Sequence, residues 1–181
     1  MDLFEIELAL PSLDVLVGQA KSAIADLMKK EHPVVVAWSS GKDSSVTLAL
    51  VLEVAREFRA MGRSAKVVVT TSDTLVESPE IARHIKVEMR KIQRYAKKHQ
   101  LDVECHIAKP NLMATWQMKV LSGRGLPSYA GNNSDCSMDL KITPQRALRK
   151  RLFARFKEQG LPDPVTCLGT RFLVPSTVFI N

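Results

Sequence analysis

Residues 33–45 read PVVVAWSSGKDSS, and this segment sets the order of the elements around it. The valines predict a buried β-strand, because β-branched residues favour extended backbone and the run is apolar on both faces. The apolar segment that follows, residues 46–52 (VTLALVL), predicts a helix. A loop of small hydroxyl residues and glycine therefore joins a strand to the first turn of a helix. The backbone N–H groups of such a turn, together with the helix dipole, can hold a phosphate.

The side chains of this loop suit a polyphosphate ligand. Lys42 supplies a mobile cation, and Asp43 can orient a metal ion or a reacting group. Hydroxyl donors are supplied by Ser39, Ser40, Ser44 and Ser45. The segment is not a Walker A motif, since position 36 is valine where that motif has glycine, and Asp43 follows the lysine in place of Ser or Thr. A helix cap without a ligand is the alternative, but a cap needs one hydroxyl and this loop has four. We therefore expect a pyrophosphate-binding loop for ATP.

The loop SSGKDS resembles the SGGKDS loop of the ATP pyrophosphatase (PP-loop) superfamily, whose members split ATP between the α and β phosphates. Ser40 stands where most members have glycine, although sulfate adenylyltransferase small subunits and adenylylsulfate reductases also vary there. The resemblance implies that ATP and Mg²⁺ are the cofactors. It also implies that Lys42 stabilises charge as pyrophosphate leaves and that Asp43 positions Mg²⁺. The β and γ phosphates would be held by Ser39, Ser40, Gly41, Ser44 and Ser45.

Length and composition indicate the number of domains and the class of protein. The chain has 181 residues, of which 45% are hydrophobic, enough for one domain with a core, so we expect residues 1–181 to form a single domain. No apolar run approaches the length of a membrane span, and the N-terminus lacks the pattern of a signal peptide. Because there are also only three cysteines, we expect a cytoplasmic protein with no membrane partner.

The net charge of +7 is concentrated in two stretches. Residues 83–98 contain seven Lys or Arg residues and one acidic residue, Glu88, and residues 141–157 contain seven and no acidic residue. Basic surfaces of this kind attract polyanions such as nucleic acid. Either stretch alone is more typical of a solvated helix face. Two such stretches beside a phosphate loop make nucleic acid an equal candidate.

The hydrophobic pattern predicts an α/β fold with a mainly parallel sheet and helices on both faces. Ligands of such sheets bind beyond the carboxyl ends of the strands, where the phosphate loop, Asp73-Thr74 and residues 169–171 all fall. We expect Asp73 and Thr74 to line the adenosine pocket; the alternative is a helix-entry turn. Helices are expected at residues 11–30, from the phosphate loop to residue 61, from residues 78–80 through Tyr95, at 113–121 and at 143–159. Strands are expected at 33–38, 66–71, 101–108 and 164–169.

Further segments resemble one branch of this superfamily, the phosphoadenosine phosphosulfate (PAPS) reductase-like DndC proteins. Residues 73–79 (DTLVESP) resemble their DTLVENP segment, and residues 125–128 (GLPS) their GYPS/T loop. Residues 135–144 (DCSMDLKITP) are similar to WCTDRLKIxP, and residues 168–171 (LGTR) to the GxR stretch that follows. The resemblance implies an adenine nucleotide alpha-hydrolase-like (Rossmann-like) fold. It also implies a role as the ATP pyrophosphatase and sulfurtransferase-type component of DNA phosphorothioation, a DNA modification.

That resemblance assigns further roles and partners. Lys141 and Arg171 would face the α-phosphate or the acceptor anion, although Lys141 alone could equally be a surface lysine. DNA, a cysteine desulfurase that donates sulfur, and other subunits of the modification complex would be the partners. Residues 172–176 (FLVPS) depart from the acidic and serine residues expected after GxR. Relatives also continue into a C-terminal portion that has no counterpart here.

Cys136 allows two interpretations. An isolated cysteine is most often a small buried residue, but in a polar loop beside Lys141 it would be accessible and able to act as a nucleophile or ligand. In relatives the matching cysteine is a ligand of an iron–sulfur cluster together with cysteines of the C-terminal portion. Such a cluster needs about four cysteine ligands, and Cys105 and Cys167 are predicted inside strands. We therefore expect a complete cluster only in a longer relative.

Three functions remain open at this stage. The first is adenylation of a DNA backbone phosphate ahead of sulfur transfer. The second is sulfate activation or reduction of an adenylylated sulfate, as in PAPS reductases, for which DNA would be irrelevant. The third is a catalytically idle nucleotide-binding module of a larger complex. Transfer-RNA thiolation follows by superfamily analogy alone, because the sequence contains no added RNA-binding domain.

Overall fold

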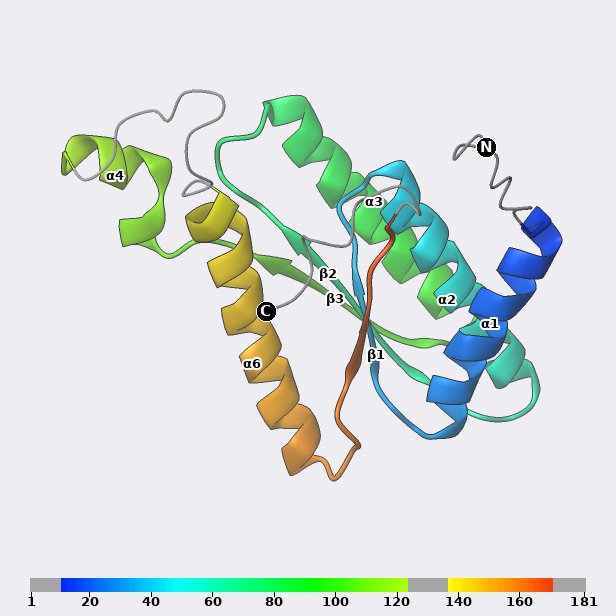
Figure 1. Ribbon diagram of the computed structural model, residues 1–181. Coiled ribbons are helices and arrows are strands. Elements are labelled where there is room, and N and C mark those ends of the chain that lie inside the picture. Colours follow the sequence, from blue (N-terminus) through cyan, green and yellow to red (C-terminus); the bar gives the residue numbers. More distant parts are fainter. Residues whose placement is uncertain (1–10, 124–136, 171–181) are drawn as a thin grey trace, which may run out of the picture.

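A computed structural model describes residues 11–123 and 137–170 of the chain. Within these residues four parallel strands form one sheet in the order β3-β2-β1-β4 (Figure 1). The strands are β1 (Val34–Ala37), β2 (Lys66–Ser72), β3 (Asp102–Ala108) and β4 (Val165–Cys167). Helices cover both faces of the sheet. The predicted class, an α/β fold built on a parallel sheet, is confirmed.

Strand β1 is the centre of the fold. It pairs with β2 on one side and with β4 on the other, so that Val34 lies between Val67 and Val165. The side chains of Val34, Val35 and Val36 are almost fully buried, because neighbouring strands and both helix layers surround them. A continuous run of valines is therefore what this position requires.

The helices divide between the two faces according to the direction of each crossover. α1 (Leu13–Lys29), α2 (Lys42–Ala60) and α3 (Pro79–Lys98) cover the face that carries Val34, Val36, Val67 and Val69. α6 (Thr143–Glu158) covers the other face through Leu148, Leu152 and Phe156. The chain steps outward from β1 to β3 and then returns past β1 to β4, and right-handed crossovers place helices on opposite faces when the direction reverses. The carboxyl ends of β1 and β4 therefore form the switch point where such folds bind ligands.

Between β3 and α6 the structure differs in detail from the sequence-based expectation. The helix predicted at residues 113–121 is divided into a 3₁₀ turn, η1 (Leu112–Ala114), and a short helix, α4 (Trp116–Leu121). Thr115 separates them, because its extended backbone ends η1 and its hydroxyl caps α4 by accepting from the N–H of Met118. A π-helical turn, η2 (Met138–Ile142), precedes α6 and was not predicted.

Some apolar side chains of α1 and α3 are exposed. Leu13 and Leu16 of α1 are 74% and 43% exposed, whereas Ile24 and Met28 of the same helix are buried. α1 packs against α2, and only its second half reaches the core among the described residues. Ile81, in the first turn of α3, is also exposed. Among the helices of residues 11–123 and 137–170, none is long and apolar enough to span a membrane.

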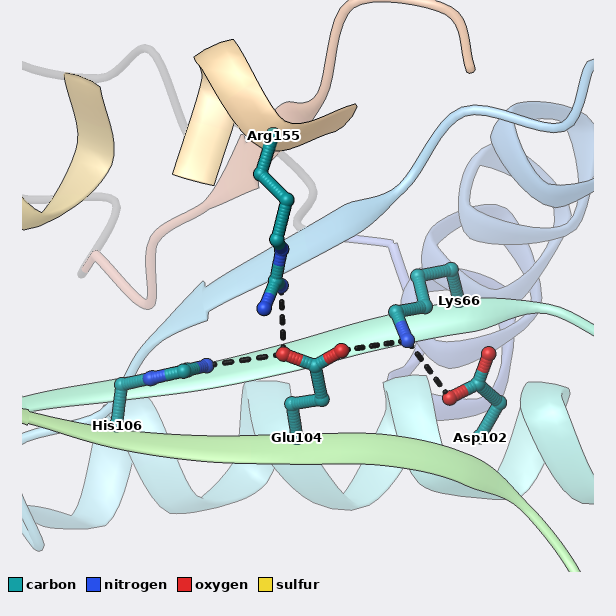
Figure 2. A network of polar contacts seen from close by, with 5 residues as sticks. All are labelled: Lys66, Asp102, Glu104, His106 and Arg155. Atoms are coloured by element: carbon teal, nitrogen blue, oxygen red, sulfur yellow. Dashed lines mark hydrogen bonds and ion pairs between the residues drawn. The ribbon is translucent and has the colours of Figure 1, made fainter. Parts of the chain in front are cut away.

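A polar network joins the edge strand β3 to β2 and α6. Figure 2 shows Glu104 of β3 at its centre, where its carboxylate accepts hydrogen bonds from three side chains. The donors are Lys66 Nζ of β2 at 2.6 Å, Arg155 Nη2 of α6 at 2.6 Å and His106 Nε2 at 3.0 Å. Lys66 also pairs with Asp102 at 2.9 Å. The network thus ties three elements together on the α6 side of the sheet.

The charge of Glu104 is strongly stabilised by these donors. Burial alone would raise the pKa of Glu104, but the hydrogen bonds from Lys66, His106 and Arg155 outweigh it and hold the pKa at about 2. A carboxylate whose pKa is lower in the folded chain than in the unfolded chain stabilises the fold above the unfolded pKa. That contribution is lost as the pH falls from the ordinary value of 4.5 toward 2.

Replacing Glu104 with Gln should therefore lower the free energy of unfolding at pH 7 by about 1–2 kcal/mol, after allowance for solvent screening. The variant should also lose less stability than the wild type as the pH falls from 5 to 2, because the titrating group is gone. Urea unfolding at pH 7, 5 and 3 measures both effects. Asp26→Asn is the control, since Asp26 forms one exposed ion pair with Lys29. Equal pH dependence in wild type and Glu104→Gln would contradict the prediction.

Candidate functional site

The loop between β1 and α2 is braced from within by Ser44. The Ser44 hydroxyl accepts from the N–H of Ser39 at 3.2 Å, contacts the Ser39 hydroxyl at 3.1 Å and donates to the carbonyl of Gly41 at 3.1 Å. Ser44 is only 6% exposed. The hydroxyl of Ser45 accepts from Trp38 Nε1 at 3.2 Å. These two serines, predicted as phosphate ligands, therefore hold the shape of the loop, and their contact with a ligand stays a prediction.

Ser40 has an unusual backbone. Its φ is +60°, in the left-handed region that side chains other than glycine enter at a cost. Position 40 is also where the loop departs from the glycine of the SGGKDS pattern. Glycine would therefore suit this position, because it enters the left-handed region without steric cost. Strained backbone of this kind is concentrated at binding and catalytic sites.

The N-terminus of α2 has no side-chain cap. Its N-cap residue, Gly41, makes no side-chain hydrogen bond to the first turn. By contrast, α1, α3 and α4 begin at Ser12, Ser78 and Thr115, and each of these hydroxyls accepts from the first turn of its helix. The serines of the loop thus do not serve as an ordinary N-cap of α2, which was the alternative interpretation of the motif. Lys42 and Asp43 occupy the first turn, where the dipole of α2 favours an anion.

Gly169, just after β4, lies against this first turn. A Cβ atom placed on Gly169 would come within 2.5 Å of the carbonyl oxygen of Asp43 and 2.7 Å of the Thr47 hydroxyl. Both distances are far below van der Waals contact, so only glycine fits without a backbone shift. The sequence placed residue 169 at a strand end, but it did not indicate this contact. Gly169 fixes how closely β4 approaches the phosphate loop.

A cavity of about 350 Å³ opens at the carboxyl ends of β1, β2 and β4. This volume lies in the usual range of small-molecule sites. Its walls combine hydroxyl groups with a few apolar and charged side chains contributed by six separate segments. The lining residues are Ala37, Trp38, Ser39, Ser44, Thr70, Thr71, Ser72, Glu77, Ile85, Lys141, Gln145, Leu168 and Gly169.

Lys141 reaches this cavity from the π-helical turn η2. Its Nζ lies 3.9 Å from Glu77 Oε1, which belongs to the segment between β2 and α3. Both side chains line the cavity, and Lys141 remains mostly exposed. π-turns inside helices are rare and occur frequently at functional sites. The structure therefore places Lys141 on the same cavity as Ser39 and Ser44, while its predicted role at the α-phosphate stays a prediction.

Asp73 and Thr74 follow β2 as predicted, but they are not among the residues that line the cavity. Asp73 accepts from the N–H of Leu75 at 3.2 Å and pairs with Lys109 at 3.5 Å. Thr74 is buried, and its hydroxyl accepts from the N–H of Val76 at 3.5 Å. The two side chains thus shape the turn that leads toward α3. Their predicted contact with adenosine is not visible in this arrangement and stays a prediction.

Several lining residues, among them Gln145 and Glu77, were not predicted as site residues. Gln145 Nε2 of α6 donates to the hydroxyl of Ser72 at 3.0 Å, which joins α6 to the end of β2 at the cavity. Gln145 continues the apolar stripe of Leu148, Leu152 and Phe156, so a polar residue on a core-facing position was the available signal. Glu77 lies within the DTLVESP segment and could have been found there.

Two of the predicted site residues, Cys136 and Arg171, lie outside the described residues, so their roles stay predictions. Cys105 and Cys167 are in β3 and β4, as predicted, and burial raises the pKa of both thiols, that of Cys105 to about 11. They share one row across the four strands and are therefore separated by about 14 Å, too far to bind one metal. Within residues 11–123 and 137–170, no group of three His, Cys, Asp or Glu residues could hold a metal ion.

The fold and the cavity define a doubly wound α/β protein with a cavity at the switch point, where such folds bind ligands. No protein-family model matches the chain, and neither does any curated protein. Among solved structures, NAD⁺ synthetase from Burkholderia pseudomallei is similar to 89% of the chain, with 18% sequence identity and a TM-score of 0.49. The chain spans 64% of the length of that synthetase. A likeness at this level does not by itself establish an activity.

Replacing Ser40 with Gly should stabilise the fold by about 0.5–1 kcal/mol, because glycine enters the left-handed region without steric cost. Thermal or urea unfolding measures the change. Gly41 has an ordinary extended backbone with φ of −78°, so Gly41→Ala is the control and should bring no such gain. A loss of stability in Ser40→Gly would contradict the assigned backbone geometry.

Replacing Gly169 with Ala should destabilise the fold by about 1–3 kcal/mol, because the added Cβ must displace the backbone of the first turn of α2. Gly18 of α1 is the matched control, since a Cβ there meets nothing within 4 Å. Gly18→Ala should be neutral or stabilise α1 by up to about 1 kcal/mol. Comparable unfolding midpoints for the two variants would show that Gly169 does not lie against Asp43.

Proposed function

We propose that this chain is an ATP pyrophosphatase of the PP-loop type, which cleaves ATP between the α and β phosphates. The observation that carries the proposal is the α2 N-terminus, which follows the central strand at the switch point, has no side-chain cap and opens beside a hydroxyl-lined cavity. A helix N-terminus in this position offers donors and a positive dipole to a polyphosphate. The SSGKDS sequence supplies the lysine and carboxylate that such a ligand requires.

The residues of the loop have different proposed roles. The N–H groups and hydroxyls of residues 39–41 contact the β and γ phosphates, while Ser44 and Ser45 keep the loop in shape. Lys42 stabilises the negative charge that grows on pyrophosphate as it leaves. A single carboxylate at Asp43 fits Mg²⁺ carried by the phosphates, since Mg²⁺ in such sites takes one or two carboxylates together with phosphate oxygens. When bound, Mg²⁺ would neutralise phosphate charge and fix the leaving group.

The cavity accommodates the rest of the nucleotide. Hydroxyl groups of Thr70, Thr71 and Ser72 at the end of β2, with the Gln145 amide, supply hydrogen-bonding groups for a nucleoside. Lys141, which also lines the cavity, would meet the α-phosphate or the anion that attacks it. Arg171 would join it two residues after Gly169.

At the finer level we propose that the attacking group is a nonbridging oxygen of a DNA backbone phosphate. The oxygen attacks the α-phosphorus of ATP, a phosphorus–oxygen bond forms, and the bond to pyrophosphate breaks. The adenylated phosphate then carries AMP as a leaving group, which the outer sulfur of a persulfide on a partner cysteine desulfurase displaces. A thiol then attacks the remaining sulfur–sulfur bond, so that the thiol and the donor cysteine leave as a disulfide and the phosphorothioate is released. This chemistry explains why ATP is needed, because an oxide is a poor leaving group. Support comes from the DTLVESP and DCSMDLKITP segments, which resemble DndC proteins.

Chromatography of nucleotide products after incubation with Mg²⁺-ATP, with and without DNA, tests the proposal. AMP and pyrophosphate support α–β cleavage, and stimulation by DNA supports phosphorothioation over sulfate activation. Stimulation by sulfate in its place would favour the PAPS reductase-type alternative. ADP as the product would contradict the proposal. ATP binding without turnover, even with partner proteins present, would identify an idle nucleotide-binding module.

Asp43→Asn should reduce metal-dependent AMP formation by about 100-fold or more, because the carboxylate that orients Mg²⁺ is lost. Asp14→Asn is the matched control, since Asp14 is the first-turn aspartate of α1 just as Asp43 is that of α2. The control should retain wild-type turnover, and circular dichroism should show both variants folded. Unchanged turnover in Asp43→Asn would refute the assigned role.

A further inference from the structure

The cations of α3 lie on two separate sides of its exposed surface. The core-facing side of α3 carries Ile85, Met89, Ile92 and Ala96. With about 100° of rotation per residue, five cations fall in one arc of about 80° on the exposed side. In residues 80–98, every position within this arc is Lys or Arg. We name these five residues the basic stripe: Arg83, Lys86, Arg90, Arg94 and Lys97.

The charges of the basic stripe are not neutralised within the described part of the chain. All five side chains are exposed, and no hydrogen bond or ion pair among the described residues engages them. The acidic residue Glu88 lies on the other side of the helix, where it pairs with Lys91 at 2.7 Å. Like charges at helical spacing repel one another, so the stripe costs stability in the isolated chain. Contact with a polyanion would remove that cost.

The basic stripe begins in the turn of α3 that carries Ile85, a residue that lines the cavity. Ile85 itself faces the core, so the stripe and the cavity share this end of α3 but lie on different sides of the helix. α3 leads away from the carboxyl ends of the strands, and the stripe follows it for about 21 Å from residue 83 to residue 97. A duplex advances about 3.4 Å of axis per base step, so this length covers about six steps. The stripe therefore offers five cations over a length in which a duplex presents several backbone phosphates.

The second basic helix, α6, is arranged differently. Its exposed cations are Arg146, Arg149, Lys150, Arg151 and Lys157, which spread over about 200° of the helix. A sixth cation, Arg155, is held by Glu104. α6 also lies on the opposite face of the sheet from α3 (Figure 1). α3 therefore offers a polyanion one continuous row of cations, whereas the cations of α6 form no row of equal regularity.

We infer that the basic stripe of α3 binds the phosphodiester backbone of a nucleic acid and leads it to the cavity. An anionic membrane is a poorer fit, because the arc contains no apolar side chain that could enter a bilayer and the apolar side of α3 is used in the core. The inferred binding depends on the charge pattern alone. The further step, that the bound backbone supplies the acceptor phosphate, rests on the proposed function.

A pair of matched double variants tests the inference. Lys86→Gln with Lys97→Gln removes two charges from the stripe, and Lys91→Gln with Lys98→Gln removes two from the other side of the same helix. Binding of the full chain to a fluorescent 20-bp DNA duplex, an RNA duplex of the same length and phosphatidylserine vesicles is measured without ATP between 50 and 200 mM salt. Because ATP is absent, failure to bind is separable from failure to form AMP.

The stripe variant should bind nucleic acid about tenfold more weakly, and its slope of log affinity against log salt should fall by about 2. The control variant should change the slope by less than about 0.5. Preference for DNA or for RNA identifies the nucleic acid, and either supports the inference. Equal loss in the two variants, absence of nucleic-acid binding by the wild type, or preferential binding of vesicles would each overturn it. Circular dichroism verifies that both variants retain the fold.

Discussion

The burial of β1 between two strands and two helix layers is the constraint on which the rest of the structure depends. Val34, Val35 and Val36 have no access to solvent on either face, so the strand must carry β-branched apolar residues and its backbone must pair on both sides. Polar groups can appear only where the strand ends. The phosphate loop is placed there for this reason, and the reversal of chain direction at β1 keeps the space beyond it open.

Much of the architecture was predictable because its signals are local. The valine run, Pro79 after a capping serine, and the stripe of Leu148, Leu152 and Phe156 each specify one element with little help from the rest of the chain. A mainly parallel sheet was predicted from the alternation of strands and helices, whereas the order of the strands was not. What escaped the sequence depends on contacts between distant segments. The approach of Gly169 to Asp43, the bond of Gln145 to Ser72 and the π-turn at Lys141 arise from packing that no single window of sequence encodes.

The chain uses its many charges in two different ways. Around Glu104 the cations are paired, partly covered and structural, and they join β2, β3 and α6. In the basic stripe of α3 they are exposed, evenly spaced and without partners among the described residues, whereas Lys91 of the same helix pairs with Glu88. Composition alone does not distinguish these two groups of cations, because a net charge of +7 does not show which lysines and arginines form ion pairs. The structure separates the cations that join elements of the fold from those that make no ion pair among the described residues.

The network at Glu104 has a further consequence for the edge of the sheet. Among the described residues β3 pairs only with β2, so its other side offers unpaired backbone groups to any extended chain. Asp102, Glu104 and His106 point to one face of this strand, and an added strand would have to bury charge beside them. Charged side chains on edge strands are a common means by which natural sheets prevent edge-to-edge aggregation. The residues that fasten β3 to its neighbours thus also discourage it from recruiting another copy of the chain.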